Sequence, residues 1–190
     1  MAKFTQKAIM ITFLEILKQK SLDKITVKDI IEKAEINRNT FYYYYDDIYD
    51  LIDSIFETEK QMVMGKRKEN STFYDEFVNA ASIVINHRQA IAHIYYSKSK
   101  DLLYNYLEEV TEEVVRRFVK KAAKGYDISE DGIEYVTYFY SSAIVGSTMH
   151  WVRQGMPDYS KSLIRKISDT FEVSLEVVIK DCVEKEKAKE

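Results

Sequence analysis

The stretch NRNTFYYYYDDIYD, residues 37–50, places an arginine and two asparagines in front of four consecutive tyrosines. Arginine presents paired donors that match guanine, and the asparagine amide matches adenine, so both residue types are suited to reading base edges. A tyrosine can pack in a core, form a stacking surface or direct its hydroxyl at a polar partner. Which of these roles each tyrosine has depends on the secondary-structure element that carries it and on the face where it lies.

The sequence gives little support for catalysis or metal binding. It shows no nucleophile with a base and an orienting residue, no glycine loop that would cradle phosphate, and no metal-ligand spacing. His93 and His150 lie in apolar stretches without a partner at ligand spacing. We therefore expect a protein that is not an enzyme and that holds no metal or cofactor.

The composition predicts an all-α fold. Five glycines and one proline in 190 residues, with 46% hydrophobic and 31% charged residues, are typical of long amphipathic helices. Cys182 is the single cysteine, and no apolar run approaches about 20 residues, so we expect a cytoplasmic protein without membrane contact. The net charge is −3, yet residues 1–45 hold eight Lys/Arg against five Asp/Glu, which indicates a polyanion-binding segment.

Apolar spacing predicts the first helix and the organisation of the remaining chain. Phe4, Ala8, Ile11, Leu14 and Leu17 recur every three or four residues, so we expect a helix over 3–20 that buries this stripe. Periodicity and capping residues predict about nine helices in total, the others lying near 27–34, 38–45, 48–64, 72–87, 88–96, 100–124, 129–153 and 160–184.

The second and third helices form a helix-turn-helix pattern. Thr26, with Asp29 three residues later, resembles a capping box, and Asn37 caps the next helix after a connection of only three residues. Ile36 and Phe41 occupy the positions of a hydrophobic staple. Two short helices joined by so tight a turn are typical of DNA-binding proteins, in which the second helix reads the major groove.

Residues 8–56 resemble the DNA-binding domain of the TetR family of bacterial transcriptional regulators. The stretch ITVKDIIEKAEINRNTFYYYYDDIYDLI matches the family's T-V-x-x-I-a opening, its A-G-V-S-like turn, the T-F-Y-x-Y-F run and a following leucine. IVGSTMHWVRQGMP resembles the carboxyl domains of a branch common in Firmicutes, some of whose members are labelled regulators of dihydroxyacetone kinase. The resemblance implies a helix-turn-helix DNA-binding domain over 1–46 and a helical ligand-binding and dimerisation domain over 47–190.

The tyrosines separate by their positions on a helix that begins at Arg38. Phe41 and Tyr45 lie four residues apart on the stapled face and are expected in the core, while Arg38 and Asn39 occupy the exposed first turn that reaches base edges. The resemblance implies that Thr40, Tyr42 and Tyr44 contact phosphate or stabilise the helix turn, while Tyr43 lies at a variable position of the pattern. The predicted DNA-binding residues are Thr26, Lys28, Asn37, Arg38, Asn39, Thr40, Tyr42, Tyr43, Tyr44 and Ile48.

Three residues depart from the family pattern. Glu35 and Asn39 stand where glycine is common, and Ile48 replaces a lysine that binds phosphate at the start of the fourth helix. The leading prediction is a sequence-specific transcriptional regulator that acts as a homodimeric, ligand-responsive repressor, with double-stranded operator DNA and an unknown small-molecule effector as partners. The alternative is a protein-binding transcriptional coactivator with weakened DNA contacts.

The carboxyl-terminal two thirds offer candidates for a ligand cavity and a dimer interface. Aromatic segments at 91–106 and 135–146 would line a cavity for a partly apolar ligand, although aromatic residues at helical spacing are usually core. The candidate ligand residues are His93, Tyr95, Tyr96, Tyr138, Phe139 and Trp151. Two apolar stripes predict the dimer interface, although each would equally bury against its own subunit: Tyr140, Ala143, Gly146, Ser147, Ile167, Phe171, Ser174 and Val178.

Overall fold

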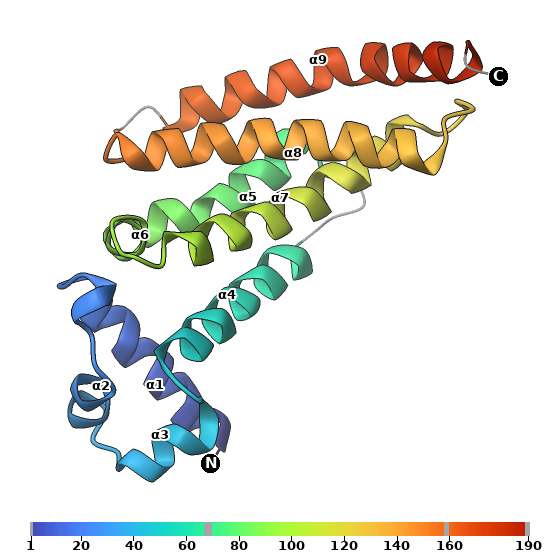
Figure 1. The fold of residues 1–190 in the computed structure, drawn as a ribbon. Coiled ribbons are helices and arrows are strands. Elements are labelled where there is room, and N and C mark those ends of the chain that lie inside the picture. Colours follow the sequence, from blue (N-terminus) through green and yellow to red (C-terminus); the bar gives the residue numbers. More distant parts are fainter. Residues whose placement is uncertain (1, 67–69, 158–159, 189–190) are drawn as a thin grey trace. The chain divides into compact units, whose positions relative to one another are not determined.

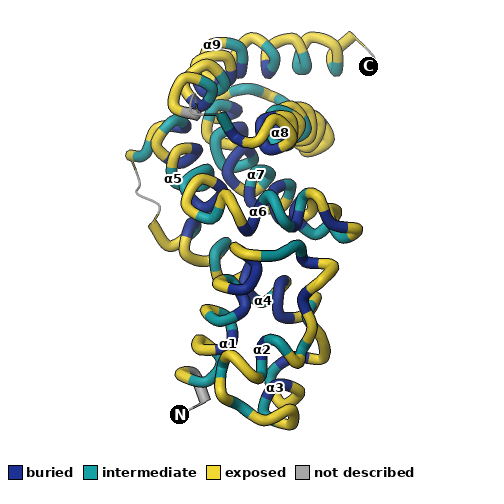
Figure 2. The backbone as a smooth tube through the Cα atoms, turned by 90° about the vertical axis from the view of Figure 1, so that its left-hand side faces the viewer, coloured by how far each residue is buried: buried dark blue, intermediate teal, exposed yellow. Residues whose placement is uncertain are grey.

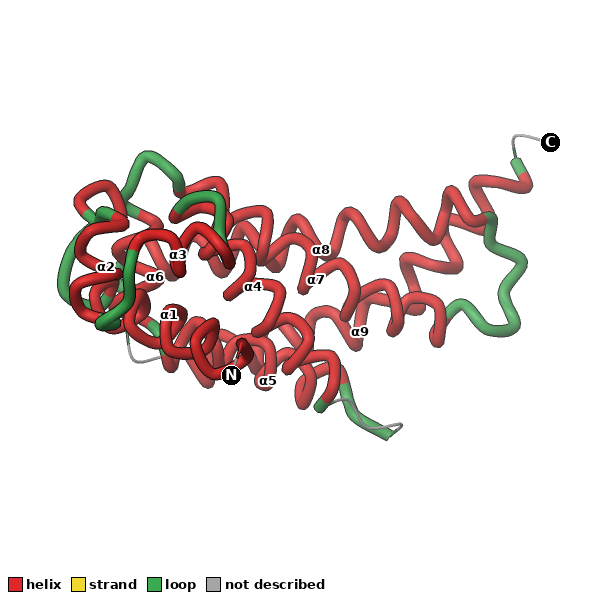
Figure 3. Tube along the Cα trace, turned by 90° about the horizontal axis from the view of Figure 1, so that it is seen from below, coloured by secondary structure: helices red, strands yellow, loops and turns green. Residues whose placement is uncertain are grey.

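The computed structural model describes residues 2–66, 70–157 and 160–188, and within these ranges it is all-α, without a β-strand (Figures 1 and 3). This confirms the predicted fold class. None of the described helices is long and apolar enough to span a membrane. The elements are α1 (Ala2–Leu17), the 3-10 turn η1 (Leu22–Lys24), α2 (Val27–Lys33), α3 (Arg38–Tyr44), α4 (Ile48–Gly65), α5 (Phe73–Asn86), α6 (Arg88–Tyr95), α7 (Lys100–Ala122), α8 (Glu130–Arg153) and α9 (Ser160–Lys187).

The chain forms two compact units, which do not coincide with a single cut in the sequence. The first unit contains residues 1–66 and 83–103, and the second contains residues 67–82 and 104–190. Helices α1 to α4 and α6 therefore belong to the first unit, α8 and α9 to the second, and α5 and α7 contribute residues to both. The DNA-binding segment expected over residues 1–46 lies wholly within the first unit, which also takes in α4.

Side-chain caps start the helices of the helix-turn-helix at the expected residues. The Thr26 backbone N–H donates to the Asp29 carboxylate at 2.7 Å, and the Asp29 N–H donates to Thr26 Oγ1 at 3.2 Å, which completes a capping box. The Asn37 side chain caps α3 by accepting from the Thr40 N–H. The hydrogen-bonded ammonium of Lys20, together with the Thr26 donors, lowers the pKa of Asp29 to about 2, so this cap stays ionised at neutral pH.

The core of the first unit contains a different face of α1 from the one that the sequence predicted. Ile9, Phe13 and Leu17 are fully buried, whereas Phe4 is 81% exposed and Ile11 is half exposed. The expectation that the stripe through Phe4, Ala8 and Ile11 packs inward was therefore wrong, apart from its carboxyl end at Leu17. The helix is apolar on more than one face, and spacing alone cannot choose between two registers.

Aromatic rings hold the core of the second unit together. Phe171 of α9 stacks on Phe73 of α5, with 4.0 Å between the ring centroids, and meets Tyr140 of α8 edge-on. Helices α8 and α9 run side by side along this core (Figures 1 and 3). Glu76, three residues after Phe73 on α5, is buried and forms an ion pair with Arg117 of α7. Removing either partner of such a pair would leave an uncompensated charge.

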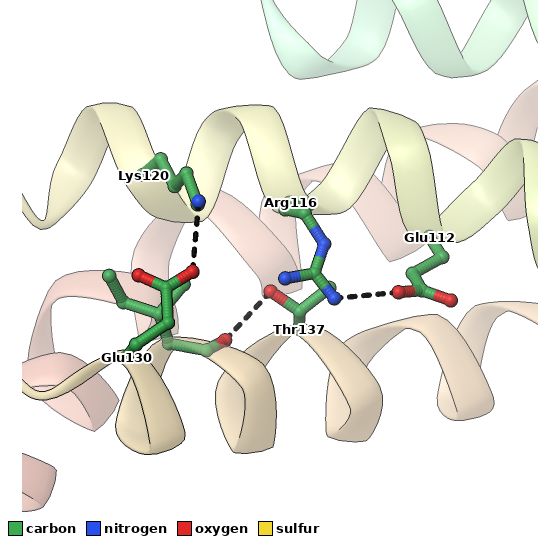
Figure 4. A network of polar contacts seen from close by, with 6 residues as sticks. Glu112, Arg116, Lys120, Glu130 and Thr137 are labelled. Atoms are coloured by element: carbon green, nitrogen blue, oxygen red, sulfur yellow. Dashed lines mark hydrogen bonds and ion pairs between the residues drawn. The ribbon is translucent and has the colours of Figure 1, made fainter.

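Polar contacts join α7 to α8 at the surface of the second unit. Lys120 donates to the Glu130 carboxylate at 3.0 Å across the two helices, while Arg116 pairs with Glu112 along α7 (Figure 4). The Thr137 hydroxyl, which is fully buried, donates to the carbonyl of Ile133 within α8. Exposed ion pairs contribute little to stability, so buried packing rather than this network must fix α7 against α8.

Candidate nucleic-acid interface

Helix α3 divides its aromatic residues between the core and the surface. Phe41 and Tyr45 are buried, which confirms their predicted core role. Tyr42 is 44% exposed and Tyr43 is 76% exposed. Arg38 is exposed at the first position of the helix, beside exposed Asn39 and half-buried Tyr44. The helix therefore presents an arginine, an asparagine and tyrosine hydroxyls outward while a phenylalanine anchors it from behind.

Two exposed side chains of α3, one turn apart, contact each other. The Arg38 Nη2 donates to the Tyr42 hydroxyl at 3.3 Å, and the guanidinium lies 5.6 Å from the centroid of the Tyr42 ring. Residues four apart on a helix are neighbours on its surface, so this pair follows directly from the sequence spacing. The contact combines a hydrogen bond with a cation–π interaction.

Three of the predicted contact residues hold the starts of helices. The Asn37 side-chain oxygen accepts from the Thr40 N–H at 2.8 Å and from the Thr40 hydroxyl at 3.0 Å. The Thr26 hydroxyl donates to the Asp29 carboxylate at 2.7 Å. These side chains position the amino ends of α2 and α3, and any phosphate contact by Thr26 or Thr40 would have to share a hydroxyl already used for capping.

Lys28 projects from the first turn of α2 and is mostly exposed. Its ammonium lies 3.6 Å from the Glu32 carboxylate, one turn further along the same helix. An exposed pair of this kind is weak, so Lys28 can exchange Glu32 for a phosphate oxygen with little loss.

The turn between α2 and α3 contains a strained residue. Glu35, where the family has glycine, adopts a φ of 53°, in the left-handed region that a side chain disfavours. The replacement of the family's glycine by Glu35 therefore has a conformational cost.

We expect Glu35→Gly to stabilise the first unit by about 1 kcal/mol, because glycine adopts this backbone conformation without a Cβ clash. Urea denaturation of the full chain measures the change in the free energy of unfolding. Glu32→Gly is the matched control, since the same replacement inside α2 should destabilise by about 1 kcal/mol. If Glu35→Gly is less stable than the wild type, the left-handed conformation of Glu35 does not destabilise the first unit.

The start of α4 is acidic where the family places a lysine. Ile48 is half-buried, and the Asp47 carboxylate accepts from the N–H groups of Tyr49 and Asp50 at 2.7 and 2.9 Å. The Asp46 N–H donates to the Asp50 carboxylate at 2.9 Å. A helix start normally offers free N–H groups and positive potential to an anion. Here the Asp47 carboxylate occupies two of those N–H groups, and the Asp50 carboxylate accepts from the Asp46 N–H just before the helix. The start of α4 therefore offers an anion fewer free donors and more negative charge than an uncapped helix start.

Comparison with known families decides the classification. Residues 14–55 match the model of the bacterial regulatory proteins of the tetR family, and residues 71–173 match the model of a transcriptional regulator carboxyl-terminal region. Together these matches cover the helix-turn-helix and most of the second unit. The chain belongs to the TetR family.

Two curated regulators are similar to part of this TetR-family chain. The chain is 33% identical over 70 residues to the dhaKLM operon transcriptional activator DhaS of Lactococcus lactis. These 70 residues are 37% of this chain and 36% of that protein. It is 30% identical over 80 residues to an uncharacterised HTH-type regulator, YxbF, of Bacillus subtilis, covering 42% of this chain but 20% of the relative. The matches thus span about a third or less of the curated relatives.

Solved structures share the fold over nearly the whole chain. A dihydroxyacetone kinase operon activator, DhaS, superposes with a TM-score of 0.75 at 18% identity, covering 91% of this chain and 97% of that one. A TetR regulator from Streptococcus agalactiae gives a TM-score of 0.61 at 22% identity, covering 88% and 95%. The TetR family that the sequence indicated is therefore confirmed, and the likeness to DhaS agrees with the branch that the sequence resembles.

The six candidate ligand residues are divided between the two units of this regulator. In the first unit, the His93 ring contacts the carbonyl oxygen of Leu17 through Nδ1, and Tyr96 is exposed. In the second, Tyr138 and Phe139 are exposed on α8, and the buried Trp151 donates from Nε1 to the Pro157 carbonyl at 3.1 Å. His93 and Trp151 thus already have backbone partners. The role of the set, which includes half-buried Tyr95, remains a prediction.

A small apolar cavity lies elsewhere in the first unit. Its volume is about 30 Å³, and its lining includes Phe13, Leu17, Ile52, Phe56, Ile91 and Ile94. A space of this size holds little more than one or two water molecules. None of the six candidate ligand residues lines it.

The candidate dimer residues separate into buried and outward-facing groups. Phe171 and Tyr140 are buried in the core of the second unit, so the structure corrects the expectation that these two face a partner. Ile167, Ser174, Val178 and Ser147 are half-buried, and Ala143 and Gly146 are exposed. The sequence reasoning did not assign to the interface the exposed apolar residues of the same two helices, and it placed two of them, Tyr138 and Phe139, in the ligand set. These exposed residues are Tyr135, Tyr138 and Phe139 on α8, with Val173 and Val177 on α9.

Proposed function

We propose that this TetR-family member is a sequence-specific, homodimeric and ligand-responsive regulator that binds double-stranded operator DNA in the cytoplasm. The outward presentation of Arg38, Asn39 and Tyr42 by α3, over buried Phe41, carries the proposal. A helix-turn-helix recognition helix contacts base edges with the residues of its first turns. Arg38 and Asn39 are then the base-reading residues, with Lys28, Tyr42, Tyr43 and Tyr44 as phosphate-side contacts.

The dimer is proposed to form through the exposed apolar face of α8 and α9. Tyr135, Tyr138 and Phe139 project from α8, and Val173 and Val177 project from α9 of the same unit. Figure 2 shows exposed residues along both helices. A Cβ added to Gly146 would have no atom within 4 Å, so the space beside this residue is open. Because glycine has no side chain, a partner helix can approach closely there. Pairing two such faces gives a four-helix interface, and a two-fold axis makes the surface self-complementary.

Regulation is proposed to act through the spacing of the two recognition helices. In a dimer these helices must enter the major groove about 34 to 36 Å apart, or a multiple of that distance. A ligand that favours another spacing releases the operator because it binds that conformation more tightly. We propose repression as the sign of regulation. The relatives named as activators make activation the competing outcome, and a promoter fusion in the source strain compares the two.

Salt-dependent binding tests the DNA-binding function and the missing lysine together. We expect the wild type to bind random duplex DNA with an affinity that falls as salt rises, since each neutralised phosphate releases counterions. Ile48→Lys should tighten binding to every duplex and steepen the slope of log K against log salt by about 0.9. Fluorescence anisotropy over a salt series measures both quantities. Ile48→Gln serves as the control, because it adds polarity without charge.

The acidic start of α4 favours one alternative, a coactivator that binds a protein and has weakened DNA contacts. Asp46, Asp47 and Asp50 surround Ile48 and would oppose a phosphate there. If the wild type shows no salt-dependent DNA binding while Ile48→Lys does, this alternative replaces the regulator that reads DNA directly. If the wild type and Ile48→Lys both bind DNA in a salt-dependent manner, the result supports a regulator that contacts DNA directly.

A further inference from the structure

We propose that Tyr42 is a positioning residue that orients Arg38 for a single base edge and thereby contributes to sequence specificity. This inference rests on the proposed DNA-binding function of α3. It assigns Tyr42 more than contact with the phosphate backbone, because a phosphate contact carries no sequence information.

The structure supplies a chain of contacts from the core to the guanidinium. Phe41 is fully buried, and the Tyr42 ring meets it edge-on with 5.5 Å between centroids. The Tyr42 hydroxyl in turn accepts the hydrogen bond from Arg38 at 3.3 Å. The flexible arginine is therefore tied to a rigid part of the domain through one aromatic ring.

Holding the arginine in one conformation matters because its side chain has several rotatable bonds. A free arginine loses that freedom when it binds a base, and this loss opposes binding. An arginine already held on Tyr42 loses less. The same contact restricts the direction in which the Arg38 guanidinium points, so that its paired donors reach the base at one position of the DNA and not the bases beside it.

The hydrogen-bonding groups of the two residues are compatible with this arrangement on DNA. The guanidinium has five N–H donors, and the contact with Tyr42 uses one of them. Two further donors can bind O6 and N7 of a guanine. A hydroxyl that accepts from arginine keeps its own proton, which it can donate to a phosphate oxygen. Tyr42 would thus join the base-reading group to the backbone of the DNA.

Tyr43 offers a matched comparison one residue away. It is more exposed than Tyr42, and its ring packs edge-on against Tyr44, with 4.9 Å between centroids. Arg38 lies four residues before Tyr42 but five before Tyr43, so the two tyrosines face different directions around α3. Loss of the Tyr43 hydroxyl should leave the orientation of Arg38 unchanged.

Selection from a pool of duplexes with a randomised central region tests the inference without a known operator. The full-length wild type, Arg38→Ala, Tyr42→Phe and Tyr43→Phe each select bound duplexes, which are then sequenced. We expect the base position that loses its preference in Arg38→Ala to lose about two- to tenfold of it in Tyr42→Phe. Tyr43→Phe should retain that preference. Circular dichroism checks that the exposed substitutions leave the fold intact.

The outcomes distinguish failure of the inference from failure of the function. If Tyr42→Phe lowers recovery of all duplexes by one factor and keeps the preference, Tyr42 is only a phosphate contact and the inference is overturned. Equal loss of preference in Tyr42→Phe and Tyr43→Phe also overturns it. A wild type that enriches no sequence over the starting pool rejects the proposed DNA-reading function itself, and the inference with it.

Discussion

Replacing Phe171 with aspartate is expected to unfold the second unit, whereas replacing Val177 with aspartate is expected to leave it folded and to separate the dimer. Phe171 is 2% exposed and stacks on Phe73, so the substitution removes a buried ring and places a charge in its site. Loss of a buried phenylalanine side chain alone costs about 3 to 5 kcal/mol, and the unpaired carboxylate adds to that. Val177 is 66% exposed on the same helix, where a charge disturbs only a partner surface.

Thermal unfolding and sedimentation measure the two effects separately. Phe171→Asp should lose its helical signal at a lower temperature than the wild type. Val177→Asp should keep the wild-type helical signal at room temperature and a cooperative melting transition, while sedimenting at half the wild-type mass. Asn105→Asp on α7 adds the same charge at an exposed position outside the proposed interface and should remain dimeric. A folded Val177→Asp variant that stays dimeric at micromolar concentration would assign the interface to another surface.

Arg38→Ala is expected to weaken binding to the selected duplex by about 1 to 3 kcal/mol and to relax preference at one base position. The exposed guanidinium supplies paired donors to a base edge, and alanine supplies none. Binding to random duplexes should fall less, since only the contribution of one charge to non-specific attraction is lost. Titrations of both duplexes at one fixed salt concentration give the specificity ratio directly.

Lys28→Ala distinguishes a base contact from a phosphate contact. Lys28 is a mostly exposed cation on α2 that pairs with Glu32 along its own helix. Its removal should weaken selected and random duplexes by a similar factor and lower the salt slope by about one. If Arg38→Ala behaves in the same way, Arg38 binds phosphate, and base reading passes to Asn39.

The helix-turn-helix could be predicted from the sequence because local interactions define it. Thr26 with Asp29, and Asn37 with Thr40, form their caps within three residues, so the signals lie in the sequence itself. The division of α3 into buried Phe41 and exposed Tyr43 follows likewise from helical geometry and one staple.

Only the tertiary structure decided which face of an apolar helix is buried. On α1 the sequence favoured the stripe through Phe4 and Ile11, but the fold buries Ile9 and Phe13. On α9 it grouped Phe171 with the dimer residues, but Phe73 of α5 already covers that ring. A helix with apolar residues on several sides admits more than one packing register. The choice depends on which distant helix reaches each face, and periodicity within one helix contains no information about its neighbours.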